Sequence, residues 1–206
     1  VGPLLSGLLH EPICVQPGPY EVDQEGYMTI PLVSERKYTL EIGIASAAKG
    51  GGILSGDSYR VLEINRRKTV IVLSDGMGNG LRAQEESSAA VDLIQEMLQS
   101  GFSEEMAIQT INSVLNLRSP EEMYATVDLA LIDLYDARAK FLKVGSTPSF
   151  IKRGQQVFTV QGSALPLGIL QEVEVEGQTE KLRQGDLLIM MTDGLFEGPK
   201  PIVNSD

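Results

Sequence analysis

The chain has 206 residues, with 17 Lys and Arg against 28 Asp and Glu, which gives a formal net charge of −11 at pH 7. This charge excludes nonspecific binding to DNA, because a surface that binds DNA must be basic. A single cysteine, Cys14, and a single histidine, His10, exclude an internal disulfide and a zinc site built from several such ligands. No apolar run approaches the ~20 residues of a membrane span, so we expect a soluble, cytoplasmic chain.

The N-terminal residues differ in composition from the rest of the chain. Residues 1–30 contain four of the ten prolines and four acidic residues, but no Lys or Arg. This composition predicts a linker over residues 1–36, with a short helical turn around Leu4–Leu9. Residues 37–206 are then expected to form the folded domain.

The first elements of this domain are predicted to be strands followed by two helices. Residues 38–44 alternate apolar and polar side chains, which is the period of a half-buried strand. Residues 59–64 and 69–73 predict two strands joined by a polar turn. Residues 87–98 and 103–117 carry apolar side chains at helical spacing and predict two helices.

Strands resume in the second half of the chain. Residues 126–134, 140–144, 157–160 and 187–191 each predict a strand, and residues 172–180 predict a further edge strand. The connections are of hairpin length and leave no room for helical crossovers. The sequence therefore predicts an α+β fold with antiparallel sheets.

Two apolar strands end in the same way. Residues 70–76 and 187–194 each run through aliphatic side chains to a small hydroxyl residue and then Asp-Gly, at Asp75 and Asp193. An Asp at the end of a buried strand is costly unless a partner offsets its charge, and carboxylates suit hard divalent cations. Asp57 lies at a similar boundary. The alternative is that each Asp-Gly pair is only a turn.

A glycine-rich run covers residues 49–56. It is similar in composition to a phosphate-binding loop, but it lacks the Gly-Lys-Ser/Thr ending and does not open a helix. A phosphate contact is therefore the less favoured interpretation of this run.

Four strings occur in the order found in the bacterial branch of the metal-dependent Ser/Thr protein phosphatases (PPM, protein phosphatase 2C-like). They are Gly56-Asp-Ser-Tyr59, Ser74-Asp-Gly-Met-Gly-Asn-Gly80, Gly145-Ser-Thr-Pro-Ser149 and Gly185-Asp-Leu-Leu-Ile-Met-Met-Thr-Asp-Gly194. The chain resembles this family from about Val33 to Lys200, and most closely its sporulation members. The resemblance implies a sandwich of two stacked, mostly antiparallel sheets flanked by helices, with residues 37–206 as the phosphatase domain and residues 1–36 as the tail of a regulatory region.

The resemblance also implies a two-ion Mn²⁺ or Mg²⁺ site. Asp75 would bridge the two ions, Gly76 would donate its carbonyl, Asp193 would bind the second ion, and Asp57 would be a direct or water-mediated ligand. Asp75 and Asp193 are the residues expected to be essential for catalysis. A shared water made acidic by two ions would attack a phosphoserine in line.

Two departures from the family pattern lower the expected activity. Many relatives have a His two residues after the bridging Asp as a candidate general acid, and here that position is Met77. The closing Asp-Asp-x-Thr motif does not occur before Asp206, so we expect a C-terminally truncated fold that binds its second ion poorly.

The substrate that the resemblance implies is a phosphorylated anti-anti-sigma factor, a small STAS-domain protein whose dephosphorylation activates a sporulation sigma factor. A local charge of +4 makes residues 140–153 a candidate docking surface, with Lys140, Lys143, Lys152 and Arg153. A solvated hairpin edge is the alternative. A homodimer is possible, and the resemblance implies the cytoplasmic domain of a membrane-anchored protein. The competing hypothesis is a catalytically impaired phosphatase-fold module used for docking or dimerisation.

Overall fold

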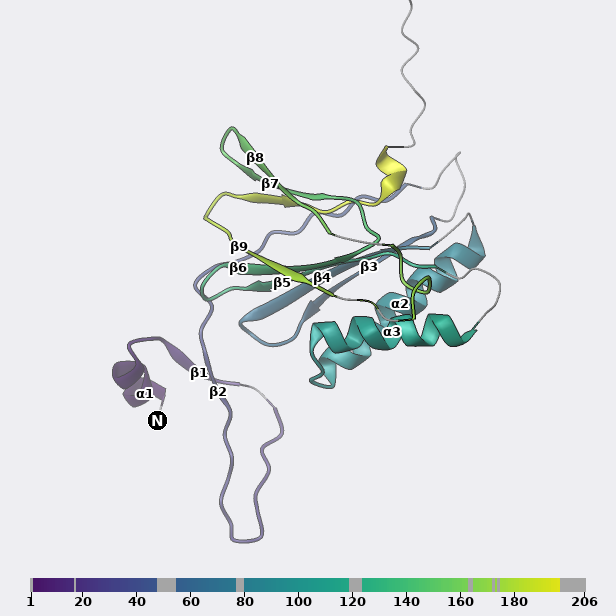
Figure 1. The fold of residues 1–206 in the computed structure, drawn as a ribbon. Coiled ribbons are helices and arrows are strands. Elements are labelled where there is room, and N and C mark those ends of the chain that lie inside the picture. The colour runs from purple at the N-terminus through teal and green to yellow at the C-terminus, as the bar shows by residue number, and fades with distance from the viewer. Residues whose placement is uncertain are drawn as a thin grey trace, which may run out of the picture.

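Two stacked β-sheets with a pair of helices on one outer face form the body of the molecule (Figure 1). The computed structural model describes residues 2–16, 18–47, 55–76, 80–118, 124–162, 165–171, 173 and 175–196. Every strand pairing between named strands is antiparallel, as the short connections predicted. The α+β sandwich is therefore confirmed.

The larger sheet has five strands in the order β3-β4-β5-β6-β9. Its strands are β3 (Asp57–Glu63), β4 (Lys68–Asp75), β5 (Val127–Asp133), β6 (Arg138–Val144) and β9 (Gly177–Lys181). All five fall within or close to the stretches predicted as strands. The central strands are rich in Val, Ile and Leu because both of their faces are covered.

Two helices, α2 (Leu81–Gln99) and α3 (Glu104–Arg118), cover one face of the larger sheet. Val91 and Ile94 of α2 and Ile108 of α3 are fully buried in one apolar cluster with Val70 and Val72 of β4. The predicted helices are confirmed, and each extends beyond its apolar repeat. Between them, Gly101 adopts φ 87°, a left-handed conformation that ends α2 and favours glycine.

A three-stranded sheet in the order β10-β7-β8 covers the other face of the larger sheet (Figure 1). Its strands are β7 (Ser149–Arg153), β8 (Gln156–Val160) and β10 (Leu187–Ile189). A second apolar cluster, which includes Phe141, Ile132 and Ile151, fills the space between the sheets. Strand β7 was not predicted, because its sequence Ser-Phe-Ile-Lys-Arg is short and half polar.

The N-terminal residues form a small separate unit. Helix α1 (Gly2–Leu9) confirms the predicted helical turn and has no buried residue; it precedes a two-stranded ladder of β1 (Ile13–Val15) and β2 (Leu32–Ser34). Figure 1 shows this unit to one side of the sandwich. No described helix is long and apolar enough to cross a membrane.

The prediction of a strand at residues 38–44 is wrong. These residues have no ladder partner, and Ile42 and Ile44 are exposed. The backbone amides of Lys37 and Tyr38 donate to the carbonyl of Leu134, and Leu40 packs on the cluster between the sheets. Alternation predicted the half-buried character of Leu40, but a strand also requires a neighbouring backbone, which alternation does not report.

Candidate metal centre

Two of the three candidate ligands face each other across neighbouring strands. Asp57 opens β3 and Asp75 ends β4, and the antiparallel register places them directly opposite one another. Alternation along β4 turns Val70 and Val72 toward the helices, so Asp75 points to the side of the smaller sheet. Directly opposed residues have Cβ atoms about 4.5–5.5 Å apart, so the two carboxylates share one corner of the sandwich.

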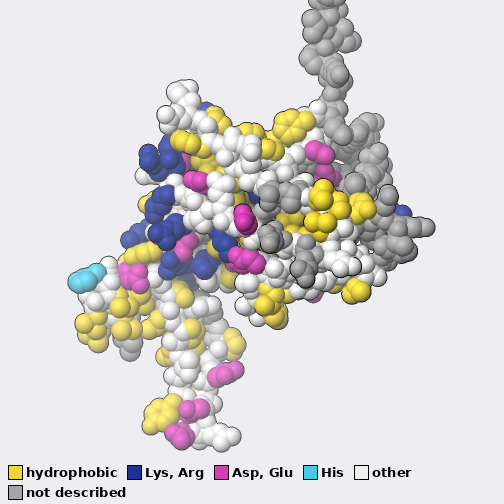
Figure 2. Space-filling view, in the orientation of Figure 1, with side chains coloured by type: hydrophobic (Ala, Val, Ile, Leu, Met, Phe, Trp, Pro, Cys, Tyr) yellow, Lys and Arg dark blue, Asp and Glu magenta, His cyan; other side chains and the backbone are white. Residues whose placement is uncertain are grey.

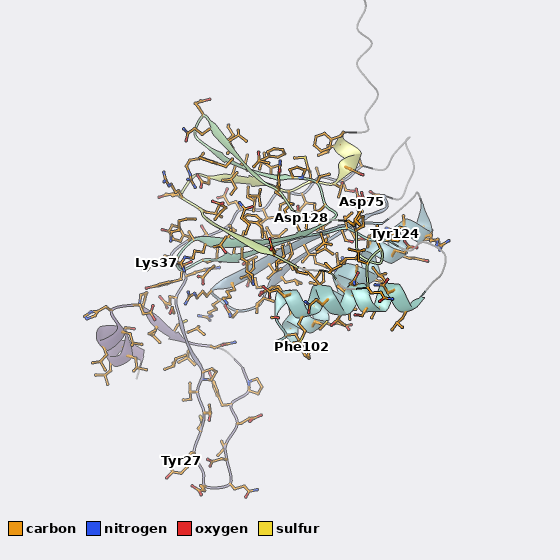
Figure 3. All side chains as sticks on the ribbon, viewed as in Figure 1. Tyr27, Lys37, Asp75, Phe102, Tyr124 and Asp128 are labelled. Carbon is orange, nitrogen blue, oxygen red and sulfur yellow. The ribbon has the colours of Figure 1, made fainter. Side chains whose placement is uncertain are left out.

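The third candidate ligand reaches this corner from the smaller sheet. After β10 the chain passes through Thr192 into a 3-10 turn, η2 (Asp193–Leu195). Thr192 Oγ1 donates to Asp57 Oδ2 at 3.0 Å, and Asp193 lies close enough to Asp75 to raise the pKa of its carboxyl. Burial, together with the neighbouring carboxylates Asp193 and Asp57, raises the pKa of Asp75 to about 8. Figure 3 shows Asp75 at one end of the sandwich, between the sheets.

Asp57 and Asp193 both lie near Asp75, but the three carboxyls do not converge on one point. Among the described residues, no group of three or more His, Cys, Asp or Glu side chains is arranged as a single formed metal site. Asp57 and Asp193 both raise the pKa of Asp75. Carboxylate oxygens are the ligands that hard divalent cations prefer, so the chemistry of this corner is compatible with such ions.

The backbone around Asp75 is held tightly. Asp75 N donates to Thr126 Oγ1 at 3.0 Å, and Thr126 N donates to the Asp75 carbonyl at 3.0 Å. Gly76 forms an isolated bridge with Ala125. A Cβ added to Gly76 would lie 2.0 Å from the carbonyl oxygen of Ala83 in α2, so only glycine fits here. The first turn of α2 therefore rests directly on the predicted Gly76 ligand.

The predicted docking surface does not form as one patch. Lys143 is buried with Asp128 at 2.5 Å, Lys140 is paired with Glu104 at 3.0 Å and with Glu105 at 2.5 Å, and Arg153 is paired with Asp186 at 2.6 Å. Of the four residues, Lys152 alone is fully at the surface. The count of +4 along the chain omitted the acids that the fold brings to three of these cations. Figure 2 shows Lys and Arg side chains gathered at the end of the sandwich near Lys37, away from Asp75.

A cleft between the two sheets contains Asp57, Asp75, Thr192 and Asp193 in its lining. Two predicted features near this cleft, Met77 and most of the glycine-rich run 49–56, lie outside the described residues. No role was predicted for Thr192, Thr147 or Asp128, although Thr192 and Thr147 lie within the strings that carry the family resemblance. The available signal was their position, since each is a small polar residue next to a predicted strand end or inside an apolar strand.

The fold and this row of aspartates define a class. The fold is similar to that of the PP2C phosphatase domain with a fragment of the regulatory domain of SpoIIE from Bacillus subtilis. This solved structure superposes with a TM-score of 0.78 and 52% identity, over 99% of this chain and 60% of that one. The chain is thus a member of the PP2C-like, metal-dependent phosphatase class.

Sequence comparison identifies the family within this class. A family model described as Stage II sporulation protein E (SpoIIE) matches residues 65–206, so the chain belongs to the stage II sporulation protein E family. Stage II sporulation protein E of Bacillus subtilis (strain 168) is 52% identical over 206 residues, which cover 100% of this chain and 25% of that protein. Phosphoserine phosphatase RsbP of the same organism is 22% identical over 180 residues, 84% of this chain and 43% of that protein. The chain thus spans less than half the length of these relatives.

Proposed function

We propose that this chain is the catalytic part of a metal-dependent protein phosphatase that removes phosphate from phosphoserine. The observation that carries the proposal is the arrangement of Asp75 between Asp57 and Asp193, all lining one cleft. Three acids with no cationic partner at this corner, among the residues described, are expensive for the fold unless cations bind there.

In this proposal Asp57, Asp75, Asp193 and the carbonyl of Gly76 would hold two Mn²⁺ or Mg²⁺ ions. Such ions supply a hydroxide at neutral pH and neutralise charge on the phosphoryl oxygens. Asp75 is held in place by its two hydrogen bonds with Thr126, one to the Thr126 hydroxyl and one from the Thr126 amide, and Asp57 by the hydroxyls of Thr192 and Ser55. These fixed partners orient the carboxylates before substrate arrives, which reduces the reorganisation needed in the transition state.

The substrate class is a phosphorylated anti-anti-sigma factor, a small STAS-domain protein, and the consequence is activation of a sporulation sigma factor. Family membership supports this assignment, and the related RsbP carries the name phosphoserine phosphatase. We place the chain in the cytoplasmic part of a membrane-anchored protein that can form a homodimer. The cleft between the sheets is the entry for the phosphoserine.

The test is phosphate release from a phosphoserine-containing STAS-domain protein while Mn²⁺ is titrated. Asp75→Asn should lower the rate at least about 100-fold, because the bridging charge is lost. Asp92→Asn is the matched control, since Asp92 is an ion-paired acid on the outer side of α2, with Arg60 at 2.6 Å. It should retain the wild-type rate. Equal rates for wild type and Asp75→Asn would contradict the proposal.

A phosphatase-fold module for docking or dimerisation is the second candidate. The observation that favours it is that the three carboxyls do not converge on one point among the described residues. The same experiment separates the two functions. A module would bind the STAS-domain protein but release no phosphate at any Mn²⁺ concentration, and Asp75→Asn would change neither result.

A further inference from the structure

A lysine, an aspartate and a serine are buried together between the two sheets. Lys143 of β6 and Asp128 of β5 are opposite one another in the ladder, and each side chain is 1% exposed. Lys143 Nζ lies 2.5 Å from Asp128 Oδ2 and donates to Ser149 Oγ at 2.8 Å, and Ser149 Oγ in turn donates to Asp128 Oδ2 at 2.8 Å. Ser149 is the first residue of β7, so this network joins the larger sheet to the smaller one.

The network lies on the same face of the larger sheet as the metal centre. Along β5, Val127 and Leu129 face the helices, and Asp128 between them faces the smaller sheet. Thr126, two residues before Asp128 and on the same face, accepts the hydrogen bond from Asp75 N. The buried ion pair is therefore one step along β5 from the bridging aspartate.

A short segment connects this network to the third ligand. Segment 145–149 begins at Gly145, whose φ of 64° turns the chain out of β6, and it ends at Ser149. Within it, Thr147 Oγ1 donates to the carbonyl of Met191 at 2.5 Å. Met191 is followed by Thr192, which donates to Asp57, and by Asp193, which contacts Asp75. Hydrogen bonds and short lengths of backbone thus link Lys143 to Asp193.

Stability alone does not explain a charged pair at this position. A buried ion pair rarely stabilises a fold more than apolar side chains of the same volume would. Its value is in geometry, because a directional network allows one arrangement of the two sheets where an apolar contact would allow several. Asp57 and Asp75 are in the larger sheet, and Asp193 begins the turn η2 that follows β10 of the smaller one. The relative placement of the sheets therefore affects the distance between the proposed ligands.

We propose that Lys143 and Thr147 are positioning residues of the metal centre, which act through segment 145–149 to set the place of Asp193 opposite Asp75. This inference rests on the proposed metal-dependent function and assigns Lys143 a role inside the sandwich, distinct from docking at the surface. Neither residue touches the phosphoserine in this account. Their effect is on the affinity of the site for its ions.

The test measures Mn²⁺ affinity of the full-length gene product by isothermal titration calorimetry. Thr147→Val removes the hydroxyl and keeps the shape, and it should weaken Mn²⁺ binding about ten-fold, the usual effect of losing an outer partner of a metal site. Thr147→Ser keeps the hydroxyl and should stay within about two-fold of wild type. Thr110→Val is the control, because Thr110 donates to the Met106 carbonyl in α3, on the outer helical layer. It should leave the affinity unchanged.

A second variant and a second readout test the contribution of Lys143. Ser149→Ala cuts the link between the ion pair and β7 without leaving either charge alone, and it should weaken Mn²⁺ binding in the same direction as Thr147→Val. In metal-free protein both variants should speed hydrogen exchange at the amide of Phe196, which donates to the Asp193 carbonyl at 2.8 Å.

The outcomes separate this inference from the proposed function. If the wild type binds Mn²⁺ and Thr147→Val binds it with the same affinity, the role of Thr147 is overturned. The same result for Ser149→Ala overturns the role of Lys143. Equal losses in Thr147→Val and Thr147→Ser would assign the effect to packing and overturn the role of the hydroxyl. A wild-type protein that binds no Mn²⁺ overturns the proposed function, and this inference with it.

Discussion

Two groups of charged side chains lie on the inner side of the larger sheet, and they differ in whether each acid is paired with a base. At the end of the sandwich lie Asp57, Asp75 and Asp193. Among the described residues, they form hydrogen bonds with hydroxyls and backbone groups. One step along β5, Asp128 is matched by Lys143 and Ser149. The carboxylates of the first group repel one another, whereas in the second group Lys143 neutralises the charge of Asp128.

The difference teaches how to distinguish a binding site from a structural ion pair. Burial raises the pKa of Asp128 and lowers that of Lys143, and in each case the charge of the partner opposes the shift. Among the residues that the structure describes, Asp75 has no such partner, and Asp57 and Asp193 raise its pKa further. Acids without a neutralising partner, beside a pair that is neutralised, are the pattern expected of the proposed metal ligands.

Breaking the compensated pair should have the largest effect on stability. Lys143→Met leaves Asp128 buried without its cation, which should lower the free energy of unfolding by about 3–5 kcal/mol in urea denaturation. Adding Asp128→Leu should recover most of the loss, because the pair is then replaced by apolar side chains. A double variant no more stable than Lys143→Met would mean that the pair does not behave as a unit.

Filling the uncompensated group with metal should stabilise the protein. At Mn²⁺ concentrations near 100 times the dissociation constant, the free energy of unfolding should rise by about 2.7 kcal/mol over that in EDTA. The cause is relief of the repulsion among the three carboxylates. Thermal unfolding with and without EDTA measures the change, and Asp75→Asn should abolish it while Asp92→Asn, at the outer Arg60 pair, should retain it.

Closing the space beside Gly76 should affect both the fold and the site. The added methyl group of Gly76→Ala would meet the Ala83 carbonyl, so the start of α2 must move. We expect a loss of about 1–3 kcal/mol in the free energy of unfolding, together with weaker Mn²⁺ binding. Gly154→Ala is a comparison, since its added Cβ meets no atom within 4 Å although its φ of 57° also disfavours alanine. It should cost stability without changing Mn²⁺ affinity.

The pH dependence of stability should show the same contrast on a smaller scale. With a pKa of about 8 against 3.8 in the unfolded chain, folded Asp75 keeps a proton that the unfolded chain has released. The contribution of protonated Asp75 to the free energy of unfolding is fully present below the pKa of the unfolded chain. It is lost as the pH rises toward 8. In EDTA the free energy of unfolding should fall by about 1–2 kcal/mol between pH 5 and pH 8, because solvent at this half-buried site screens part of the repulsion.

Asp75→Asn should flatten that pH profile. Asp133 is a useful contrast, because Arg67 and the backbone amide of Tyr135 outweigh burial and lower its pKa. Its contribution is present above the unfolded value and is lost only as the pH falls below it, so Asp133→Asn should leave the slope between pH 5 and pH 8 as in wild type. If Asp75→Asn had the same slope of unfolding free energy against pH as wild type, the three acids would not be the cause of the pH dependence.

The sequence predicted most of the secondary structure, because its signals there are local. Apolar spacing located α2 and α3, and short apolar runs bounded by polar turns located β3 to β6. The prediction of strands failed where strand formation depends on pairing with a neighbouring strand. Residues 38–44 alternate but have no neighbouring backbone, and β7 forms from a half-polar stretch because β8 and β10 lie on either side of it.

The sequence by itself also identified Asp57, Asp75 and Asp193 as candidate ligands. An acid at the boundary of an apolar strand can be recognised along the chain without knowledge of the fold. Only the tertiary structure decided which charges meet. It brought Asp193 from the far end of the chain to Asp75, and it took Lys143 from a predicted surface to a buried pair. The physical reason is that electrostatic energy depends on distance and burial in space, and neither follows from a count of charges along the chain.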